Sequence, residues 1–290
     1  MKENKARVIA FYLPQYHPIP ENDKYWGKGF TEWTNVAKAK PLFRGHYQPH
    51  IPADLGFYDL RLPEVREAQA ELARDAGIEG FCYYHYWFGN GKMLLQKPFE
   101  EVLRLGKPDF PFCLCWANHD WTTKTWVKGS SMVNNTMIAQ QEYLGEQDDI
   151  KHFEYCLRAF KDHRYITIEG KPIFLIYDPL SFPNVKEFMN RWNFLAKKNN
   201  LKGIYFIGVT TGRQSSYKIV TNLGFDGVCH NRRWEAEAKA AGFRFVRRMQ
   251  SLLGWHLGIS LMKYDYNKVV RNYDTPENKL ENCYPVLLQD

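Results

Sequence analysis

Seven short apolar runs, separated by segments of helical periodicity, constrain the fold of this 290-residue chain more than any other feature. The runs span residues 8–13, 78–85, 109–116, 171–177, 203–209, 225–229 and 284–290. Their bulky residues do not alternate with polar ones, which is typical of parallel strands that are covered on both faces. Helical patterns are expected at residues 63–76, 97–105, 150–160, 184–195 and, in part, 235–253. This alternation predicts a (β/α)8 TIM-barrel-like fold, in which loops at the carboxyl ends of the strands carry the chemistry.

The eighth strand of such a barrel is the open question of this pattern. Residues 137–140 are one candidate, and the sequence stops directly after the run at 284–290. We therefore expect either a barrel that is incomplete at the C-terminus, lacking its last strand and helix, or an atypical closing strand. No Pro/Gly/Ser-rich linker, low-complexity tract or short-period repeat divides the chain, so residues 1–290 are interpreted as a single catalytic barrel domain.

Composition and charge narrow the classes of function. Aromatic residues make up 16% of the chain, and stacking against flat apolar ligand faces is one use for such a surplus, while aromatic core packing is the other. The net charge of +7 is dispersed, which argues against nucleic acid as a partner. No signal peptide or membrane-spanning run is expected, and six cysteines in apolar contexts predict reduced thiols in a cytoplasmic protein.

Two carboxylates stand out because each follows a predicted strand and is flanked by tryptophan. They are Glu32, before Trp33, and Asp120, before Trp121. Cleavage or transfer of a glycosidic bond needs two carboxyl groups, one to protonate the leaving oxygen and one to assist attack. A single acid at such a position is more often a cap or an ion-pair partner, so the pair remains a hypothesis here.

Four histidines also follow predicted strands, namely His17, His85, His119 and His230. They could bind sugar hydroxyls, transfer protons or hold a metal ion. No Cys-x-x-Cys is present, and no metal is expected. No phosphate-binding loop, dinucleotide-binding fingerprint, Asp-x-Asp pair or Gly-x-Ser-x-Gly elbow occurs, and no cofactor is expected.

Several motifs together resemble one known family. They lie at residues 10–23, 27–36, 46–49, 82–88 and 113–118, and include Phe-Tyr-Leu-Pro-Gln-Tyr-His at 11–17 and Gly-Phe-Thr-Glu-Trp at 29–33. They resemble the WbsX-type glycosyltransferase family of bacterial surface-polysaccharide clusters. That family is similar in fold to the family 99 glycoside hydrolases, which are retaining endo-acting α-mannosidases built on a (β/α)8 barrel. The resemblance implies that Glu32, Trp33, Asn118 and Trp121 are sugar-site residues.

This chain departs from the family pattern at three places. His119 stands where the family has glutamate in Trp-Ala-Asn-Glu-Asn-Trp, and His230 stands where the family also has glutamate. The Asn-Glu-Trp-x-Glu motif of the family's closing strand, which matches the acid pair of the hydrolases, does not occur. The resemblance therefore supplies no catalytic pair.

We predict a carbohydrate-active enzyme that cleaves or transfers glycosidic bonds in bacterial cell-surface polysaccharide biosynthesis. Glu32, Asp120 and His119 are the predicted catalytic residues. The predicted substrate-binding residues are Tyr12, Gln15, His17, Trp33, Tyr84, His85, Trp87, Trp116, Asn118, Trp121, Tyr177 and His230. The expected partner is an oligo- or polysaccharide, with peripheral association through a lipid-linked glycan. The alternatives are a glycan-binding barrel without catalysis and a metal-dependent hydrolase that uses His119 and His230.

Overall fold

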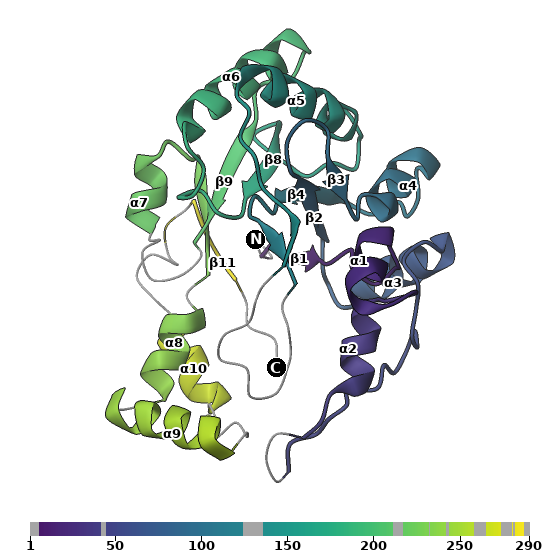
Figure 1. Ribbon diagram of the computed structural model, residues 1–290. Coiled ribbons are helices and arrows are strands. Elements are labelled where there is room, and N and C mark those ends of the chain that lie inside the picture. The colour runs from purple at the N-terminus through teal and green to yellow at the C-terminus, as the bar shows by residue number, and fades with distance from the viewer. Residues whose placement is uncertain are drawn as a thin grey trace, which may run out of the picture.

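The computed structural model contains one curled sheet of seven parallel strands, which stand side by side in chain order (Figure 1). They are β1 (Ile9–Tyr12), β2 (Gly80–Trp87), β4 (Phe112–Trp116), β8 (Lys171–Ile176), β9 (Tyr205–Val209), β10 (Gly227–His230) and β11 (Cys283–Pro285). All seven predicted strands are confirmed. The structure describes residues 6–41, 45–123, 136–210, 217–231, 233–241, 244–257, 265–273, 280 and 282–286, so the predicted end of the last strand, residues 287–290, lies outside them.

Helices follow the strands, as in a (β/α)8 barrel. Those on the outside of the sheet are α3 (Pro63–Asp75), α4 (Lys97–Leu105), α5 (Glu146–Phe160), α6 (Val185–Lys198) and α7 (Tyr217–Asn222). They begin and end close to the predicted bounds where a prediction was made. In Figure 1, α5 and α6 lie across the top of the sheet, with α3 and α4 on one side and α7 on the other. Within the described residues, β1 pairs only with β2, and β11 pairs only with β10. The sheet is therefore curled like a barrel, but it is open between β1 and β11.

The segment at 137–140 does not supply an eighth barrel strand. It forms β6 (Met137–Ala139), which pairs antiparallel with β5 (Trp121–Thr122) in a separate two-stranded sheet. Two further short strands extend the main sheet by antiparallel pairing, β3 (Met93–Leu94) on β2 and β7 (Thr167–Ile168) on β8. The expectation that residues 137–140 could close the barrel is therefore wrong.

Two helices occur where the sequence predicted only a loop. They are α1 (Pro20–Trp26) and α2 (Glu32–Lys38), each seven residues long. Pro20 occupies the first turn of α1, where its missing N–H costs nothing. Thr31 caps α2 in a reciprocal pair with Thr34. These two helices lie between β1 and α3 in the chain, and they stand on the same side of the sheet as α3 (Figure 1).

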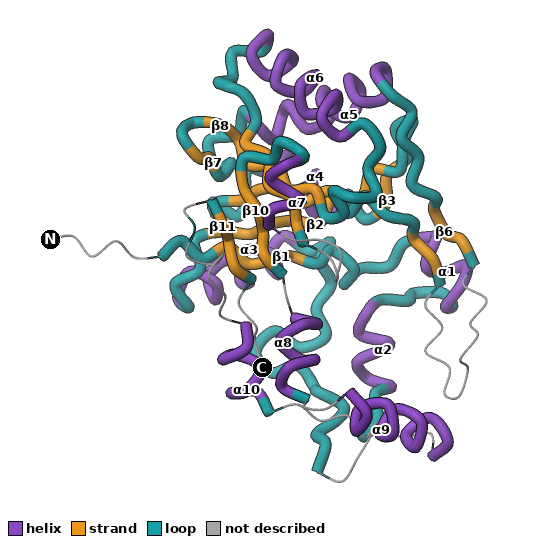
Figure 2. Tube along the Cα trace, turned by 90° about the vertical axis from the view of Figure 1, so that its left-hand side faces the viewer, coloured by secondary structure: helices purple, strands orange, loops and turns teal. Residues whose placement is uncertain are grey.

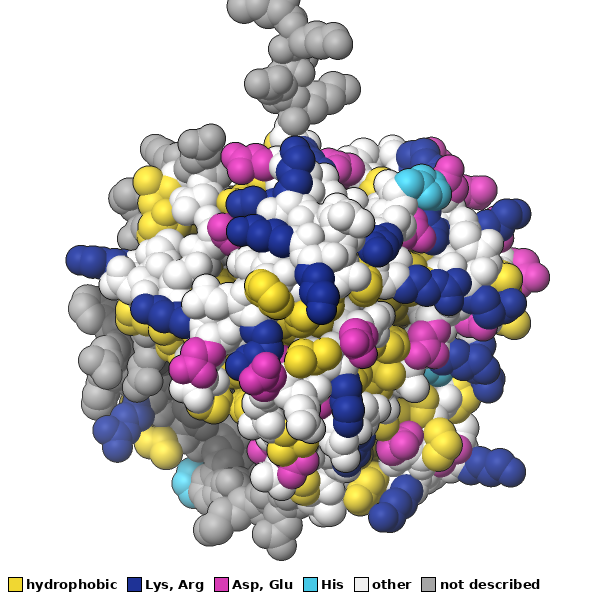
Figure 3. Space-filling model, turned by 90° about the horizontal axis from the view of Figure 1, so that it is seen from above, with side chains coloured by type: hydrophobic (Ala, Val, Ile, Leu, Met, Phe, Trp, Pro, Cys, Tyr) yellow, Lys and Arg dark blue, Asp and Glu magenta, His cyan; other side chains and the backbone are white. Residues whose placement is uncertain are grey.

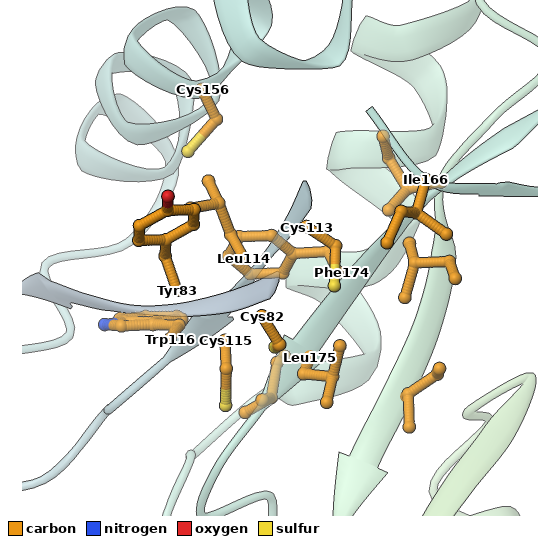
Figure 4. Packing of buried hydrophobic residues seen from close by; sticks show 14 of the residues in the cluster. Cys82, Tyr83, Cys113, Leu114, Cys115, Trp116, Cys156, Ile166, Phe174 and Leu175 are labelled. Atoms are coloured by element: carbon orange, nitrogen blue, oxygen red, sulfur yellow. The ribbon is translucent and has the colours of Figure 1, made fainter. Parts of the chain in front are cut away.

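The two faces of the sheet have different neighbours, as β2 shows. Tyr83 points outward to Phe99 of α4, with ring centroids 5.4 Å apart. Tyr84, the next residue, points inward, and its ring lies 5.4 Å from Phe11 and 6.0 Å from Tyr177. Figure 4 shows Tyr83 on the same side of the strands as Cys156 of α5. Outward residues therefore form the core under the helices, while inward residues line the inside of the curl.

The outer layer is densely aromatic. Trp192 of α6 is completely buried, and its ring lies 4.7 Å from Phe174 of β8 and 4.6 Å from Phe188. At Gly208 of β9, an added Cβ would lie only 2.4 Å from Val220, so glycine is what lets α7 pack directly on the sheet. All six cysteines are buried and free, as expected from their apolar contexts.

The last three helices lie together at the other end of the molecule. α8 (Arg233–Ala240) packs on α10 (Tyr266–Tyr273), and the Tyr273 hydroxyl donates a 3.0 Å hydrogen bond to the His230 carbonyl of β10. α9 (Arg244–Leu257) joins them, and both views place these helices and α2 opposite α5 and α6 (Figure 1, Figure 2). Seen from above, Lys and Arg side chains are interspersed with Asp and Glu (Figure 3), as the dispersed charge predicts. Among the described residues, no helix combines the length and apolar character needed to cross a bilayer.

Candidate functional site

The inner face of the sheet carries a row of aromatic and amide side chains at the carboxyl ends of β1 and β2. Gln15, which follows β1, donates from Nε2 to the Tyr86 hydroxyl at 3.3 Å. The Tyr86 ring in turn stacks on Trp121, with centroids 5.9 Å apart and planes 27° apart. Three residues from three different segments thus form a continuous surface. We call this surface row A.

Glu32 is attached to row A by the backbone. Its N–H donates to the Gln15 carbonyl at 3.3 Å, and its Oε2 accepts from Asn35 Nδ2 at 3.3 Å. Burial, and to a smaller extent the nearby Glu32 charge, raises the pKa of Tyr86 to about 12. Glu32 also stands in the first turn of α2, where unpaired backbone N–H groups favour a negative charge. The structure therefore brings Glu32, Gln15, Tyr86 and Trp121 together.

A second inner row, row B, runs from β1 to the loop after β4. It consists of Phe11, Tyr84, Tyr177 and His119, with ring centroids 5.4, 6.0 and 5.5 Å apart in that order. Burial raises the pKa of Tyr84 and of Tyr177, so both phenols keep their protons at neutral pH and can donate hydrogen bonds. His119 is exposed, while Tyr84 and Tyr177 are partly exposed, so the row ends at the open mouth.

Two aspartates stand beside these rows. Asp120 is exposed, and its Oδ1 accepts the Gln141 N–H at 2.7 Å. Asp178 lies two residues after the end of β8, and its Oδ2 accepts the Ser181 hydroxyl at 2.7 Å. Asp178 is as well placed as Asp120 at a strand end, although sequence reasoning did not select it as catalytic. Its position directly after an apolar strand was the signal that could have found it.

Asn118 holds the loops after β4 and β8 together. Its Nδ2 donates to the Asp178 carbonyl at 2.8 Å and to the Tyr143 hydroxyl at 2.9 Å. Its Oδ1 accepts the Asp178 N–H at 2.7 Å, and the side chain is buried. The side-chain amide of Asn118 is thus bonded to protein groups, and the residue is 1% exposed. Asn118 therefore positions the loops at the mouth and is not exposed in it.

Trp33 is the second residue of α2, and His17 follows β1 in the chain. The Trp33 indole donates to the Tyr58 carbonyl at 2.9 Å and packs on Tyr16 at 4.7 Å. His17 is almost fully buried, which lowers its pKa below the ordinary value and favours the neutral ring. Both residues support the segment that presents Glu32.

Five other residues predicted to bind substrate lie on the outer face of the sheet or beside it, and they are Tyr12, His85, Trp87, Trp116 and His230. All are at most 8% exposed, because strand alternation turns them toward the helices. The Tyr12 hydroxyl donates to Gln69 of α3 at 2.6 Å, and Tyr12 lines a largely apolar groove of about 360 Å³ beside β1. These side chains are therefore not part of the mouth, contrary to the prediction.

The metal site suggested for His119 and His230 finds no third ligand, because no group of three metal-ligating side chains among the described residues includes either histidine. His119 ends row B and is exposed, whereas His230 is 2% exposed. Within the described part of the chain, the only group of three metal-ligating side chains is His85, His152 and Cys156, which lies on the outer face.

The mouth combines the parts that carbohydrate chemistry requires. Rows A and B offer flat ring faces for sugar rings and protonated phenols for sugar hydroxyls. Glu32, Asp120 and Asp178 offer carboxylates, and His119 offers a further group that can transfer protons.

Comparison with known proteins gives one family over nearly the whole chain. The family model described as glycosyltransferase WbsX matches residues 8–290. The protein described as uncharacterized protein WxcX, from two strains of Xanthomonas campestris pv. campestris, is 42% identical over 223 residues. The match covers 77% of this chain and 31% of the relative, so the chain spans about a third of the length of these curated relatives.

Solved structures with similarity include two of the GH99 endo-alpha-mannosidase from Bacteroides thetaiotaomicron. The one in complex with BIS-TRIS-propane has a TM-score of 0.49 and 17% identity, and the match covers 88% of this chain and 66% of that one. A chain described as glycoside hydrolase-like protein has a TM-score of 0.46 and 15% identity, with 86% and 67% covered.

Proposed function

Since this chain belongs to the WbsX glycosyltransferase family, we propose that it is a carbohydrate-active enzyme that cleaves or transfers glycosidic bonds in the assembly of bacterial cell-surface polysaccharide. One chain of contacts carries this proposal. The Glu32 N–H bonds the Gln15 carbonyl, the Gln15 side chain bonds the Tyr86 hydroxyl, and the Tyr86 ring stacks on Trp121. A carboxylate beside a stacking platform is the arrangement that a sugar ring with a reacting bond requires.

Rows A and B would hold the saccharide. A sugar ring presents an apolar face of C–H groups and a rim of hydroxyls, which match an aromatic ring and a phenol O–H respectively. Trp121 and Tyr177 are partly exposed and offer the faces, while the protonated Tyr84 and Tyr86 hydroxyls offer the donors. The substrate class is therefore an oligo- or polysaccharide.

Glu32, Asp120 and His119 are our candidates for acid and base. One group would protonate the oxygen of the leaving sugar while a second assists the incoming water or acceptor hydroxyl. Because no Asp-x-Asp pair is present to hold a nucleotide sugar through a metal, we propose that the donor is itself a glycan.

Turnover assays test this assignment. Purified protein would be incubated with fluorescently labelled polysaccharide and, separately, with nucleotide sugars, and products would be separated by size. We expect Glu32→Gln and Asp120→Asn to lower kcat by about 100-fold or more, the scale of a lost acid or base. The matched controls are Glu71→Gln and Asp109→Asn, whose exposed carboxylates lie away from the mouth. Turnover of nucleotide sugars alone would refute the glycan-donor mechanism.

Binding without turnover is the outcome that would favour the second candidate, a glycan-binding barrel without catalysis. The supporting observation is that Asp120 already accepts a backbone N–H from Gln141 and that Asn118 is committed to the loops. In that case, glycan affinity would be unchanged in Glu32→Gln and Asp120→Asn, and Trp121→Ala would lower it by about 2- to 10-fold.

We propose further that residues 1–290 act as one catalytic barrel domain in the cytoplasm, where a lipid-linked glycan could bring the protein to the membrane surface. The six buried free cysteines support a reducing compartment. Sedimentation of the protein with vesicles that carry a lipid-linked saccharide, but not with plain vesicles, is the expected result.

A further inference from the structure

Three metal-ligating side chains meet under α5, on the face of the sheet opposite to the mouth. His85 projects outward from β2, and its Nε2 lies 2.8 Å from Nε2 of His152 on α5. Cys156, also on α5, completes a group whose ligand atoms all lie within 4.8 Å of one another. We propose that His85, His152 and Cys156 bind a thiophilic transition-metal ion, zinc(II) or copper(I), that ties α5 to β2.

The local structure explains why the three side chains converge. His152 and Cys156 are four residues apart on α5, so they occupy one face of the helix. Both are buried, at 1% and 0% exposure, and that face packs on the outer side of the sheet. His85 is an outward residue of β2, the strand that pairs with β4 in the centre of the core. Rigid elements therefore hold all three ligands.

The donor set matches the chemistry of late first-row metals. Two imidazole nitrogens and one thiolate form a trigonal set known for copper, and the same ligands suit zinc when a fourth ligand joins. Metal–nitrogen bonds of about 2.0–2.1 Å place two ligating nitrogens roughly 3.3 Å apart in a tetrahedral site. The two rings need to separate by only about half an ångström from their 2.8 Å hydrogen bond to admit the ion.

The contact between the two imidazoles favours binding. Their Nε2 atoms are 2.8 Å apart in a hydrogen bond, so one of these nitrogens accepts and presents a lone pair. Metal binding replaces the proton between the rings and the Cys156 thiol proton, both of which pass to solvent, and leaves a thiolate–metal bond.

Charge balance is favourable for either ion. Copper(I) and one thiolate are neutral together, which suits a buried site because an uncompensated charge is costly there. Zinc(II) leaves one positive charge, and Asp148 lies one helical turn before His152 on the same face of α5. Its carboxylate is held by the Trp87 indole at 3.2 Å and by the Asn90 N–H at 2.7 Å.

Aromatic rings fix the orientation of both imidazoles. Trp87 stacks on His152 with centroids 4.6 Å apart and planes 4° apart. Tyr155 stacks on His85 at 5.5 Å and 12°, and Trp192 meets His152 edge-on at 5.0 Å. Ligands that are held in this way lose little freedom when the ion binds. The site is structural in role, because none of these groups reaches the inner face.

Refolding in the presence of metal tests the proposal, since buried ligands can load an ion only while the chain is open. The protein would be unfolded in denaturant that contains a chelator, and the chelator would then be removed. It would be refolded with one equivalent of zinc(II), cobalt(II) or copper(I), desalted, and analysed for metal content by mass spectrometry. We expect one ion per chain, a thiolate-to-cobalt charge-transfer band in the near ultraviolet, and a higher Tm of the metal-loaded form.

The matched variants are Cys156→Ala and Cys115→Ala, each of which removes a thiol that is 0% exposed. Cys156→Ala should weaken metal binding by at least tenfold and remove the charge-transfer band, whereas Cys115→Ala, whose thiol faces inward, should keep both. Equal retention in the two variants would overturn the site. If a variant does not fold, the refolded wild type still tests the proposal. Absence of stoichiometric metal in the wild type with all three ions would also overturn the proposed site.

Discussion

Asn118→Ala is the sharpest test of how the mouth is held in place. The substitution removes three side-chain hydrogen bonds of 2.7–2.9 Å, two with the Asp178 backbone and one with Tyr143. At about 0.5–1.5 kcal/mol for each bond, with the Asp178 N–H left unpaired, we expect a loss of about 2–4 kcal/mol in the free energy of unfolding. For a chain of this length, that corresponds to a fall in Tm of about 3–7 °C.

Urea denaturation followed by tryptophan fluorescence measures the effect, with glycan affinity determined on the same samples. Asn272→Ala is the control, because it removes one solvent-facing hydrogen bond on α10 and should cost less than about 0.5 kcal/mol. A loss of glycan affinity in Asn118→Ala with a stability change below about 1 kcal/mol would show that Asn118 contacts sugar directly, and would refute the positioning role.

Three further predictions concern the core, pH and the sugar platform. Trp192→Ala should lower the free energy of unfolding by about 3–5 kcal/mol, while Phe194→Ala, at a site 67% exposed on the same helix, should change it by no more than about 0.5 kcal/mol in the same denaturation assay. Hydrogen bonding to Arg164 lowers the pKa of Asp162, so the stability that this pair contributes is present above the ordinary pKa near 4 and is lost as pH falls through the folded-state value. Asp162→Asn should therefore destabilise the protein at pH 7, with a gap to wild type that closes in acid titrations monitored by circular dichroism, and a constant gap would contradict this. Trp121→Ala should weaken glycan binding by about 2- to 10-fold in calorimetry if its ring stacks on sugar, whereas unchanged affinity would remove row A from the site.

The strands were predictable because burial on both faces leaves a simple trace in the sequence. The run at 109–116, for example, has no polar side chain after Asp109, and β4 (Phe112–Trp116) is buried along its whole length. Burial on both faces also removes the signal that would show which side chains point inward and which point outward. Tyr83 and Tyr84 look alike in the sequence, yet one packs on α4 and the other lines the mouth. Without polar alternation, sequence reasoning could not tell which of the aromatic residues face inward.

Short helices were missed for a related physical reason. At seven residues each, α1 and α2 are too short to show helical periodicity. The reciprocal cap of Thr31 and Thr34 involves no acidic partner, so the usual Ser/Thr-x-x-Glu signature is absent. Glu32 was nevertheless selected, because the flanking Trp33 and the preceding strand are local signals that do not depend on the helix.

The group under α5 was missed because its members belong to different elements. Only His152 and Cys156 share a sequence pattern, with three residues between them on a segment whose helical period had been recognised. A search for mixed His-x-x-x-Cys spacing on that helix would have found these two. Its third member, His85, required knowledge of which way β2 faces, and that came only with the structure.

The inward and outward positions of each strand also differ in the substitutions that they can accept during evolution. Substitutions at outward positions such as Tyr83 disturb a close-packed aromatic layer, so few variants there would survive selection for folding. Inward positions such as Tyr84 and Tyr177 are partly exposed and can vary with less damage to that layer. A combinatorial library restricted to these two codons would therefore keep a high fraction of foldable members while sampling new saccharide preferences, and lineages with different surface glycans are expected to diverge first at the same codons.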